Sequence, residues 1–149
     1  MGRLFTKLAG TAFTVSVVAV SNNAVNAAPS TAALTVDVID ASPIGGTLTA
    51  ATNCRTTWTT VIQTQTVPAA VAWVGGRVNV TINAPTKAVR NARIRVTQGA
   101  LIGCSTDNFT VRPTALTISS TNATQNNSSG APVIKTGANF NLTAASVAG

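Results

Sequence analysis

The stretch Gly103-Cys-Ser-Thr-Asp-Asn-Phe-Thr-Val-Arg-Pro113 carries the clearest structural signal in this sequence. Cys104 is followed by a polar turn around Asp107 and by a short alternating run, Phe109–Arg112, which Pro113 ends. Proline ends strand pairing because it lacks a backbone N–H, and the sequence pattern changes directly after it. The stretch therefore predicts a seam between two β-structured parts of the chain.

Each residue of this seam has a structural role to expect. The Asp107 carboxylate suits an Asx-turn, in which it accepts backbone N–H groups two residues on. Phe109 is expected to be buried at the start of the strand, and Pro113 to stiffen the hinge that follows. Arg112 is expected to bond carbonyl groups at the seam or to pair with Asp107.

Upstream of the seam, the composition favours strands. Glu is absent, and Thr, Val and Asn are abundant, which is typical of β-structure. The clearest hairpin is expected where two runs flank Gly75-Gly76, a loop that suits a type I′ or II′ turn. In its second run, alternation places Val78, Val80 and Ile82 on the core side. The expected strands are Leu34–Ile39, Thr47–Ala51, Thr56–Val67, Ala70–Val74, Arg77–Asn83, Asn91–Thr97 and one that begins at Phe109.

About seven strands within roughly 85 residues, with turns at this spacing, are typical of a β-sandwich. The sequence thus predicts an all-β fold, with an immunoglobulin-like sandwich over residues 28–113. A β-barrel is the alternative. The pattern begins again after Pro113, where Leu116–Ile118 and Phe140–Val147 are strand candidates on either side of a polar, low-complexity stretch, Thr121–Gly130. Two or three strands cannot bury a core of their own, so residues 114–149 are predicted to be a truncated second β-module.

The first 27 residues have the features of a secretory signal peptide. Arg3 and Lys7 precede an uncharged run of about 13 residues, 8–20, and residues 25–27 form a small-residue cleavage site. The run is too short to span a bilayer. We therefore expect cleavage after Ala27 and export of the rest, the alternative being an uncleaved membrane anchor.

Export favours pairing of the two cysteines, Cys54 and Cys104. A disulfide between them would close a loop of about 50 residues, which destabilises the unfolded chain by roughly 4 kcal/mol. The alternatives are two buried free thiols or a metal pair, and the absence of His disfavours a metal site.

The seam also resembles a known family. A strand with alternating arginines, Arg90–Val96, precedes the Cys-Ser-x-Asp-x-Phe-x-x-Arg-Pro pattern at 104–113, and Phe140-Asn-Leu-Thr-Ala144 follows. These stretches resemble the large MshQ-like proteins of mannose-sensitive haemagglutinin (MSHA) pilus loci. The resemblance implies an exported, multi-domain, β-rich protein of pilus or agglutinin assembly, in the periplasm, at the outer-membrane surface or outside the cell. Its partners would be other domains of a larger surface protein or pilus-assembly components.

The sequence offers no catalytic constellation. His, Glu and Tyr are absent, and the acids are Asp37, Asp40 and Asp107, whereas acid–base catalysis needs a group that titrates near neutrality or a pair of carboxylates. We expect no enzymatic activity, no catalytic residues, no metal and no cofactor. Asp37 and Asp40 could contribute to a Ca²⁺ site, but two solvated aspartates at a strand end is the simpler interpretation, because Ca²⁺ takes six to eight oxygens.

The formal net charge is +7, with 9% of residues charged. Arg77, Arg93 and Arg95 are predicted to point outward and could form a basic face for an anionic glycan. The alternative is an ordinary solvated strand face whose charges discourage aggregation. Nucleic acid is a poor candidate, because no basic run is interleaved with aromatic residues.

Together these patterns predict a structural and interaction module of a surface adhesion or pilus-assembly protein. Three alternatives remain open at this point: a glycan-binding or surface-ligand module that uses the arginine face, a pilin-like subunit completed by a partner's strand, and an accessory domain of an extracellular enzyme.

Overall fold

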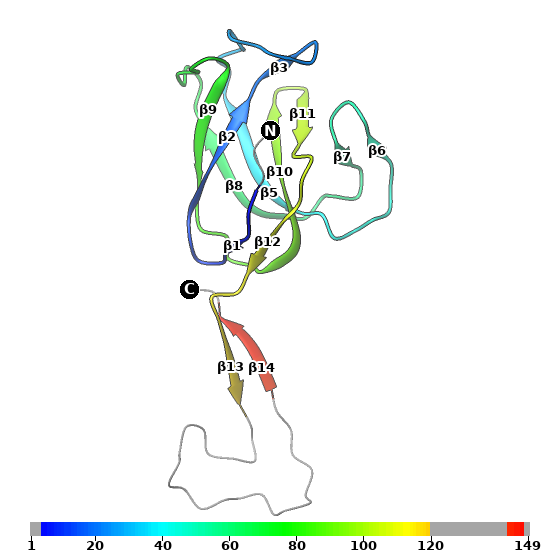
Figure 1. The fold of residues 1–149 in the computed structure, drawn as a ribbon, viewed down its shortest axis with the longest axis vertical. Helices are drawn as coiled ribbons and strands as arrows, with labels where there is room; N and C mark the ends of the chain where they lie inside the picture. The colour runs from blue at the N-terminus through cyan, green and yellow to red at the C-terminus, as the bar shows by residue number, and fades with distance from the viewer. Residues whose placement is uncertain (1–3, 120–142, 148–149) are drawn as a thin grey trace, which may run out of the picture.

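The computed structural model describes residues 4–119 and 143–147, and all regular secondary structure in them is β-strand. The all-β prediction is therefore confirmed, while the immunoglobulin-like topology stays a prediction. In this part of the chain no helix has both the length and the apolar character needed to cross a membrane. Two sheets face each other in the body of the molecule, and a hairpin ribbon extends below it (Figure 1).

The larger sheet has six strands, in the order β1-β12-β10-β5-β8, with β11 also paired to β10. Its central strands, β5 and β10, run antiparallel over six paired positions, from Ala92↔Asp40 to Thr97↔Thr35. Both strands alternate in sequence, so that one face of the sheet is apolar. The strands are β1 (Lys7–Leu8), β5 (Leu34–Asp40), β8 (Val61–Val67), β10 (Val89–Gln98), β11 (Leu101–Cys104) and β12 (Phe109–Arg112).

The second sheet pairs β2 (Phe13–Val18) with β9 (Arg77–Ile82) and covers the apolar face of the first. The predicted alternation in β9 is confirmed: every second residue is buried. Side chains from both sheets form one core, in which the rings of Phe13 and Phe109 meet edge-on at 6.0 Å between centroids. The buried members of this core are Ala9, Val15, Leu34, Val36, Val38, Val67, Val78, Val80, Ile82, Ala92, Ile94, Phe109 and Val111.

The N-terminal boundary differs from the expectation that the domain begins at residue 28. β1 and β2 both belong to the folded body, and two short strands, β3 (Val20–Ser21) and β4 (Ala24–Val25), form a hairpin after them. The physical reason is that an uncharged run in which aromatic and β-branched residues alternate with hydroxyl residues also fits a half-buried strand. The pattern that indicates a signal peptide thus also forms part of the sheet.

The predicted Gly75-Gly76 turn is confirmed, but its first strand is wrong. Both glycines have positive φ, 55° and 72°, as a type I′ turn requires. The predicted strand Ala70–Val74 is reduced to one bridge, Val74↔Arg77. Its place beside β9 is taken by β2, and Ala70 itself has a φ of 63°, which interrupts an extended run.

A long connection, residues 41–60, covers part of the outer face of the six-stranded sheet, over β5 and β10. It contains a small hairpin of β6 (Leu48–Thr49) and β7 (Cys54–Arg55). Trp58 is 6% exposed and forms a second small core with Ile39, Ala41 and Cys104. The predicted long strand Thr56–Val67 therefore begins only at residue 61, because its first part packs as a cover over the sheet.

Beyond the seam, β13 (Ala115–Ser119) pairs with β14 (Thr143–Val147) in an antiparallel ribbon. Figure 1 shows this ribbon projecting from the body. The strands expected at Leu116–Ile118 and Phe140–Val147 are thus found for their described residues, while the polar stretch Thr121–Gly130 lies outside them. The Thr114 hydroxyl donates to the carbonyl of Ala9 at 2.7 Å, which ties the start of the ribbon to the body.

Candidate functional site

A disulfide, an ion pair and a cation–π contact lie close together on the outer face of β5 and β10, beneath the 41–60 connection. The predicted disulfide is present: Cys54 and Cys104 are bonded, with their Cα atoms 5.2 Å apart. It joins the β6–β7 hairpin to β11 and so fixes the long 41–60 connection to the sheet. The N–H of Cys104 also donates to the carbonyl of Thr52 at 2.7 Å. The bond therefore works together with backbone pairing.

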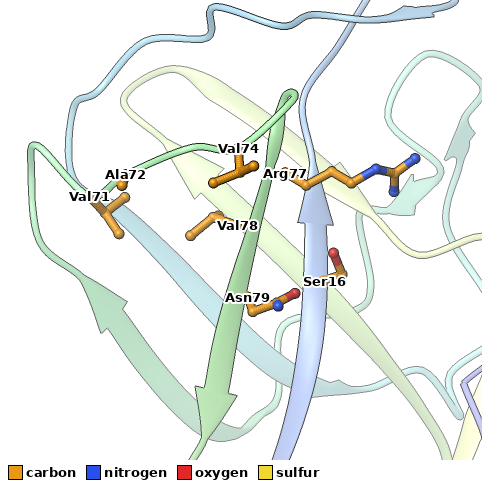
Figure 2. A pocket seen from close by; sticks show the side chains of 7 residues that line it. All are labelled: Ser16, Val71, Ala72, Val74, Arg77, Val78 and Asn79. Atoms are coloured by element: carbon orange, nitrogen blue, oxygen red, sulfur yellow. The ribbon is translucent and has the colours of Figure 1, made fainter.

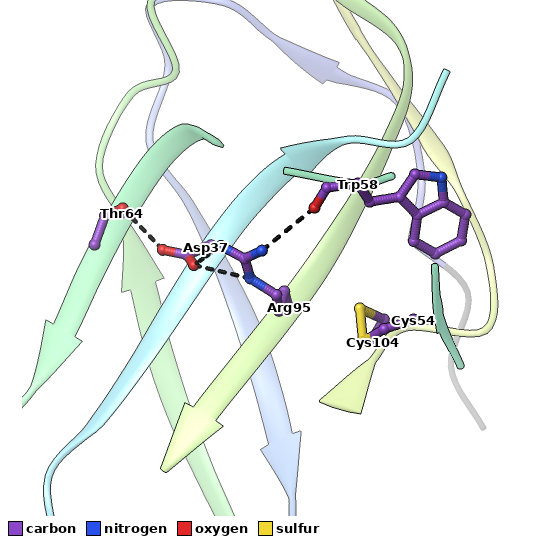
Figure 3. A network of polar contacts seen from close by, with 6 residues as sticks. All are labelled: Asp37, Cys54, Trp58, Thr64, Arg95 and Cys104. Atoms are coloured by element: carbon purple, nitrogen blue, oxygen red, sulfur yellow. Dashed lines mark hydrogen bonds and ion pairs between the residues drawn. A yellow bond between two sulfur atoms is a disulfide. The ribbon is translucent and has the colours of Figure 1, made fainter. Parts of the chain in front are cut away.

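Asp37 and Arg95 form an ion pair under this cover (Figure 3). Arg95 donates to one Asp37 oxygen from Nη2 at 2.7 Å and from Nε at 3.1 Å, and the Thr64 hydroxyl donates to the other oxygen at 2.8 Å. Arg95 also donates to the carbonyl of Trp58 at 3.3 Å. Asp37 is only 6% exposed, so the interpretation of it as a solvated aspartate is wrong.

The second aspartate of the proposed pair has a separate, local role. Asp40 accepts the N–H of Ser42 at 2.8 Å and shapes the turn that leaves β5. Each of these carboxylates is thus engaged by protein donors. Among the residues that the structure describes, no three His, Cys, Asp or Glu side chains gather as a metal-binding group.

Arg93 lies on the same face of β10 and packs on the tryptophan of the cover. Its guanidinium carbon is 4.8 Å from the centroid of the Trp58 ring, a cation–π geometry, and its Nη1 donates to the carbonyl of Ser105. Burial lowers the pKa of Arg93, an effect that Asp107 opposes and Arg55 reinforces. Trp58 is fixed in turn, because its Nε1 donates to the carbonyl of Pro43 at 2.9 Å.

The structure does not bring the three arginines of the expected ligand face together. Arg93 and Arg95 point away from the main core as expected, but both are bonded to protein groups beneath the connection. Arg77 belongs to β9 in the other sheet, where its side chain is exposed. A common anion-binding surface made of all three is therefore not formed in this geometry.

The seam motif has mainly packing roles. Phe109 is 5% exposed in the main core, and Arg112 is exposed, with its backbone carbonyl accepting the N–H of Ala9 at 2.9 Å. The turn before Phe109 is organised by Ser105, whose hydroxyl donates to the carbonyl of Asp107 at 2.9 Å and accepts the N–H of Ile94 at 3.1 Å. Pro113 follows the last residue of β12, as expected of a strand-ending proline.

An open hollow of about 480 Å³ lies beside the β2–β9 sheet, under the turn that precedes β9 (Figure 2). Its lining contains one cation, Arg77, and no carboxylate, so it has no acid–base pair. The walls are otherwise small, aliphatic or neutral polar. The lining residues are Ser16, Val71, Ala72, Val74, Arg77, Val78 and Asn79.

The sequence predicted the disulfide but not the ion pair between Arg95 and Asp37 beside it. The register places Arg95 directly between Asp37 on β5 and Cys104 on β11. A signal for this was available, since Asp37 is a lone acid inside an alternating strand and Arg95 sits in the strand with alternating arginines. A charge pair across two neighbouring strands could have been proposed from those positions.

Comparisons of the chain with protein-family models, with curated protein sequences and with solved structures find no match.

Proposed function

We propose that this chain is a non-enzymatic structural and interaction module of an exported bacterial surface protein that acts in pilus biogenesis or adhesion. The observation that carries the proposal is the Cys54–Cys104 disulfide, which holds the 41–60 connection on the sheet. Disulfides persist in oxidising compartments and are rare in the cytosol. The bond therefore favours the periplasm, the cell surface or the extracellular space as the place of work.

The polar chemistry of the module supports a structural role over catalysis. The Asp37–Arg95 pair, the Arg93–Trp58 stack and the Asp40 turn all use charged groups to hold the connection in place. Charges committed to fixed protein partners are not free to bind and transform a substrate. The resemblance of residues 90–113 to the MshQ-like proteins gives the class of assembly, a β-rich protein of the pilus or agglutinin apparatus.

The test is made in the bacterium that carries the gene. Deletion of the gene is expected to reduce surface pili or cell agglutination, counted by electron microscopy and by an agglutination assay, and the intact gene should restore both. An antibody against the module should label intact cells. Normal piliation and agglutination in the deletion strain, together with labelling only after lysis, would exclude the proposal.

Complementation of the deletion strain with two variants tests whether the disulfide-bonded fold, and not only the presence of the protein, is needed. Cys54→Ser/Cys104→Ser should restore function less well than Ser42→Ala, because the first change frees the connection and the second removes one exposed hydroxyl from it. Equal restoration by both variants at equal protein level would show that the disulfide is not needed for the role.

A further inference from the structure

Strand β2 closes one wall of the core. In the described part of the chain, β2 is the strand hydrogen-bonded to β9, in register along the whole of Phe13–Val18. Val15 is 6% exposed, and Phe13 and Val17 pack against the same cluster. Without this strand the apolar face of the larger sheet would lose part of its cover. The edge N–H and C=O groups of β9 would also lose their partners, which is costly for a strand that lines a core.

The chain on both sides of β2 is fixed to the body as well. Ala9 is 1% exposed, and its N–H donates to the carbonyl of Arg112 at 2.9 Å. At the other end of the strand, the N–H of Ala19 donates to the carbonyl of Gly76 at 2.9 Å. The segment is therefore held at its start, along its length and at its end.

The turn before β9 also lies close to the chain that follows β2, at residues 25–26. A Cβ at Gly76 would lie 2.3 Å from the carbonyl oxygen of Asn26 and 2.7 Å from Cγ1 of Val25, far inside contact distance. A Cβ at the neighbouring Gly75 would meet nothing within 4 Å, although both glycines have positive φ. The close approach of residues 25–26 thus requires glycine at position 76, but it does not require glycine at position 75.

The sequence of this segment recurs toward the other end of the chain. Residues 10–20 are Gly-Thr-Ala-Phe-Thr-Val-Ser-Val-Val-Ala-Val, and residues 137–147 are Gly-Ala-Asn-Phe-Asn-Leu-Thr-Ala-Ala-Ser-Val. The first Gly, the Phe in fourth place and the last Val coincide. An aliphatic residue stands in sixth place and a hydroxyl residue in seventh place in both. The described part of the second stretch, Thr143–Val147, is strand β14.

From these observations we infer that residues 10–20, which contain β2, are an integral part of the β-module and remain in the folded protein, and that residues 137–147 repeat their sequence pattern. The sequence pattern that contains β2 thus occurs twice in the chain, about 127 positions apart. The inference concerns which residues build the module. If it holds, the cleavage expected after Ala27 does not occur, and the proposed function then rests on the Cys54–Cys104 disulfide. The inference can therefore fail while the proposed function stands.

The first experiment compares two glycine variants of the full chain. Gly76→Ala is expected to lower the melting temperature by roughly 5 °C or more beyond Gly75→Ala, because the two share the cost of positive φ and only the first collides with residues 25–26. The intact mass of the purified, folded protein should correspond to a chain that still contains residues 13–18. A folded protein that begins at Ala28 and in which the two variants melt alike would overturn the inference. Failure of Gly76→Ala alone to fold supports it.

A second experiment tests the recurrence directly. Residues 13–18, Phe-Thr-Val-Ser-Val-Val, are replaced by the aligned residues of the second stretch, Phe-Asn-Leu-Thr-Ala-Ala. The chimera should unfold cooperatively, at a somewhat lower temperature because two valines become alanines. The control carries the same six residues shifted by one position, Ala-Phe-Asn-Leu-Thr-Ala, which turns Phe and Leu away from the core.

The two chimeras are expected to give opposite results if the second stretch carries the sequence pattern of β2. The shifted control is expected to lose its cooperative transition or to melt at least 10 °C below the aligned chimera, a difference of the size that a few core contacts produce. Equal stability of the two, whether both are high or both are low, would show that residues 137–147 do not carry the pattern that this site selects.

Discussion

Among single residues, the charged side chains of β10 behave least as their sequence pattern suggests. Alternation correctly places Arg93 and Arg95 on the face opposite Ala92 and Ile94. The pattern cannot tell whether that face meets water, because the connection that covers it lies 30 or more positions away in sequence. Both arginines therefore contact Trp58 of the 41–60 connection, and we expect these contacts to stabilise the module.

Asp37→Ala is expected to destabilise the protein by about 3 kcal/mol, since it leaves the guanidinium of Arg95 beneath the cover without its carboxylate. Asp40→Ala is the matched control. That carboxylate accepts one exposed N–H, from Ser42, so its loss should cost about 1 kcal/mol. Both values are measured by chemical denaturation of the full chain.

A double-mutant cycle isolates the pair itself. Asp37→Ala combined with Arg95→Ala should be less destabilising than the sum of the two single changes, because the double variant leaves no unpaired charge beneath the cover. Simple additivity of the two costs would mean that the contact at 2.7 Å contributes nothing of its own.

Among the elements, the strands with strict alternation were predictable, and so were two of the short ones: β6 lies inside the expected strand Thr47–Ala51, and β12 begins at Phe109 as expected. β5, β9 and β10 were expected within one or two residues, because period-2 apolar patterning is a local property. β7 and β11 were not predicted, because they are two and four residues long and depend on a disulfide and on backbone pairing across the fold. β2 was assigned another role, since a short apolar run alone does not distinguish a strand from the core of a signal peptide.

The disulfide is predicted to hold one element in particular, the β6–β7 hairpin. Reduction, or the double variant Cys54→Ser/Cys104→Ser, should lower the free energy of unfolding by about 4 kcal/mol on the chain-entropy model, given the 50-residue separation of the cysteines. Amide exchange should rise most at Leu48–Thr49 and Cys54–Arg55, since within the described part of the chain each of these strands has only the other as a ladder partner. Non-reducing peptide mapping checks the linkage, and two alkylatable thiols in protein from an oxidising compartment would contradict it.

Across the whole molecule, the seam at Pro113 separates a body that buries the inner face and part of the outer face of its main sheet from a ribbon whose described side chains are exposed. The body has two cores, one between the sheets and one beneath the connection. In the ribbon, Leu116 is 67% exposed. The sequence supported this division through the proline and the change of pattern, whereas the packing of residues 4–19 onto the body depends on contacts with β9 and β12 that no local pattern encodes.

The division predicts two levels of amide protection. Among residues 4–119 and 143–147, β14 pairs only with β13. An isolated two-stranded ribbon is marginally stable in water, so Thr143–Val147 should exchange orders of magnitude faster than Arg77–Ile82. Limited proteolysis should accordingly leave a resistant fragment that ends near Pro113 and still contains residues 13–18, because that strand is part of the body. Hydrogen exchange with mass spectrometry on the full chain measures both segments in one experiment. Equal protection of β14 and β9 would instead place the ribbon within one continuous cooperative unit, in which the proline marks a bend and not a boundary.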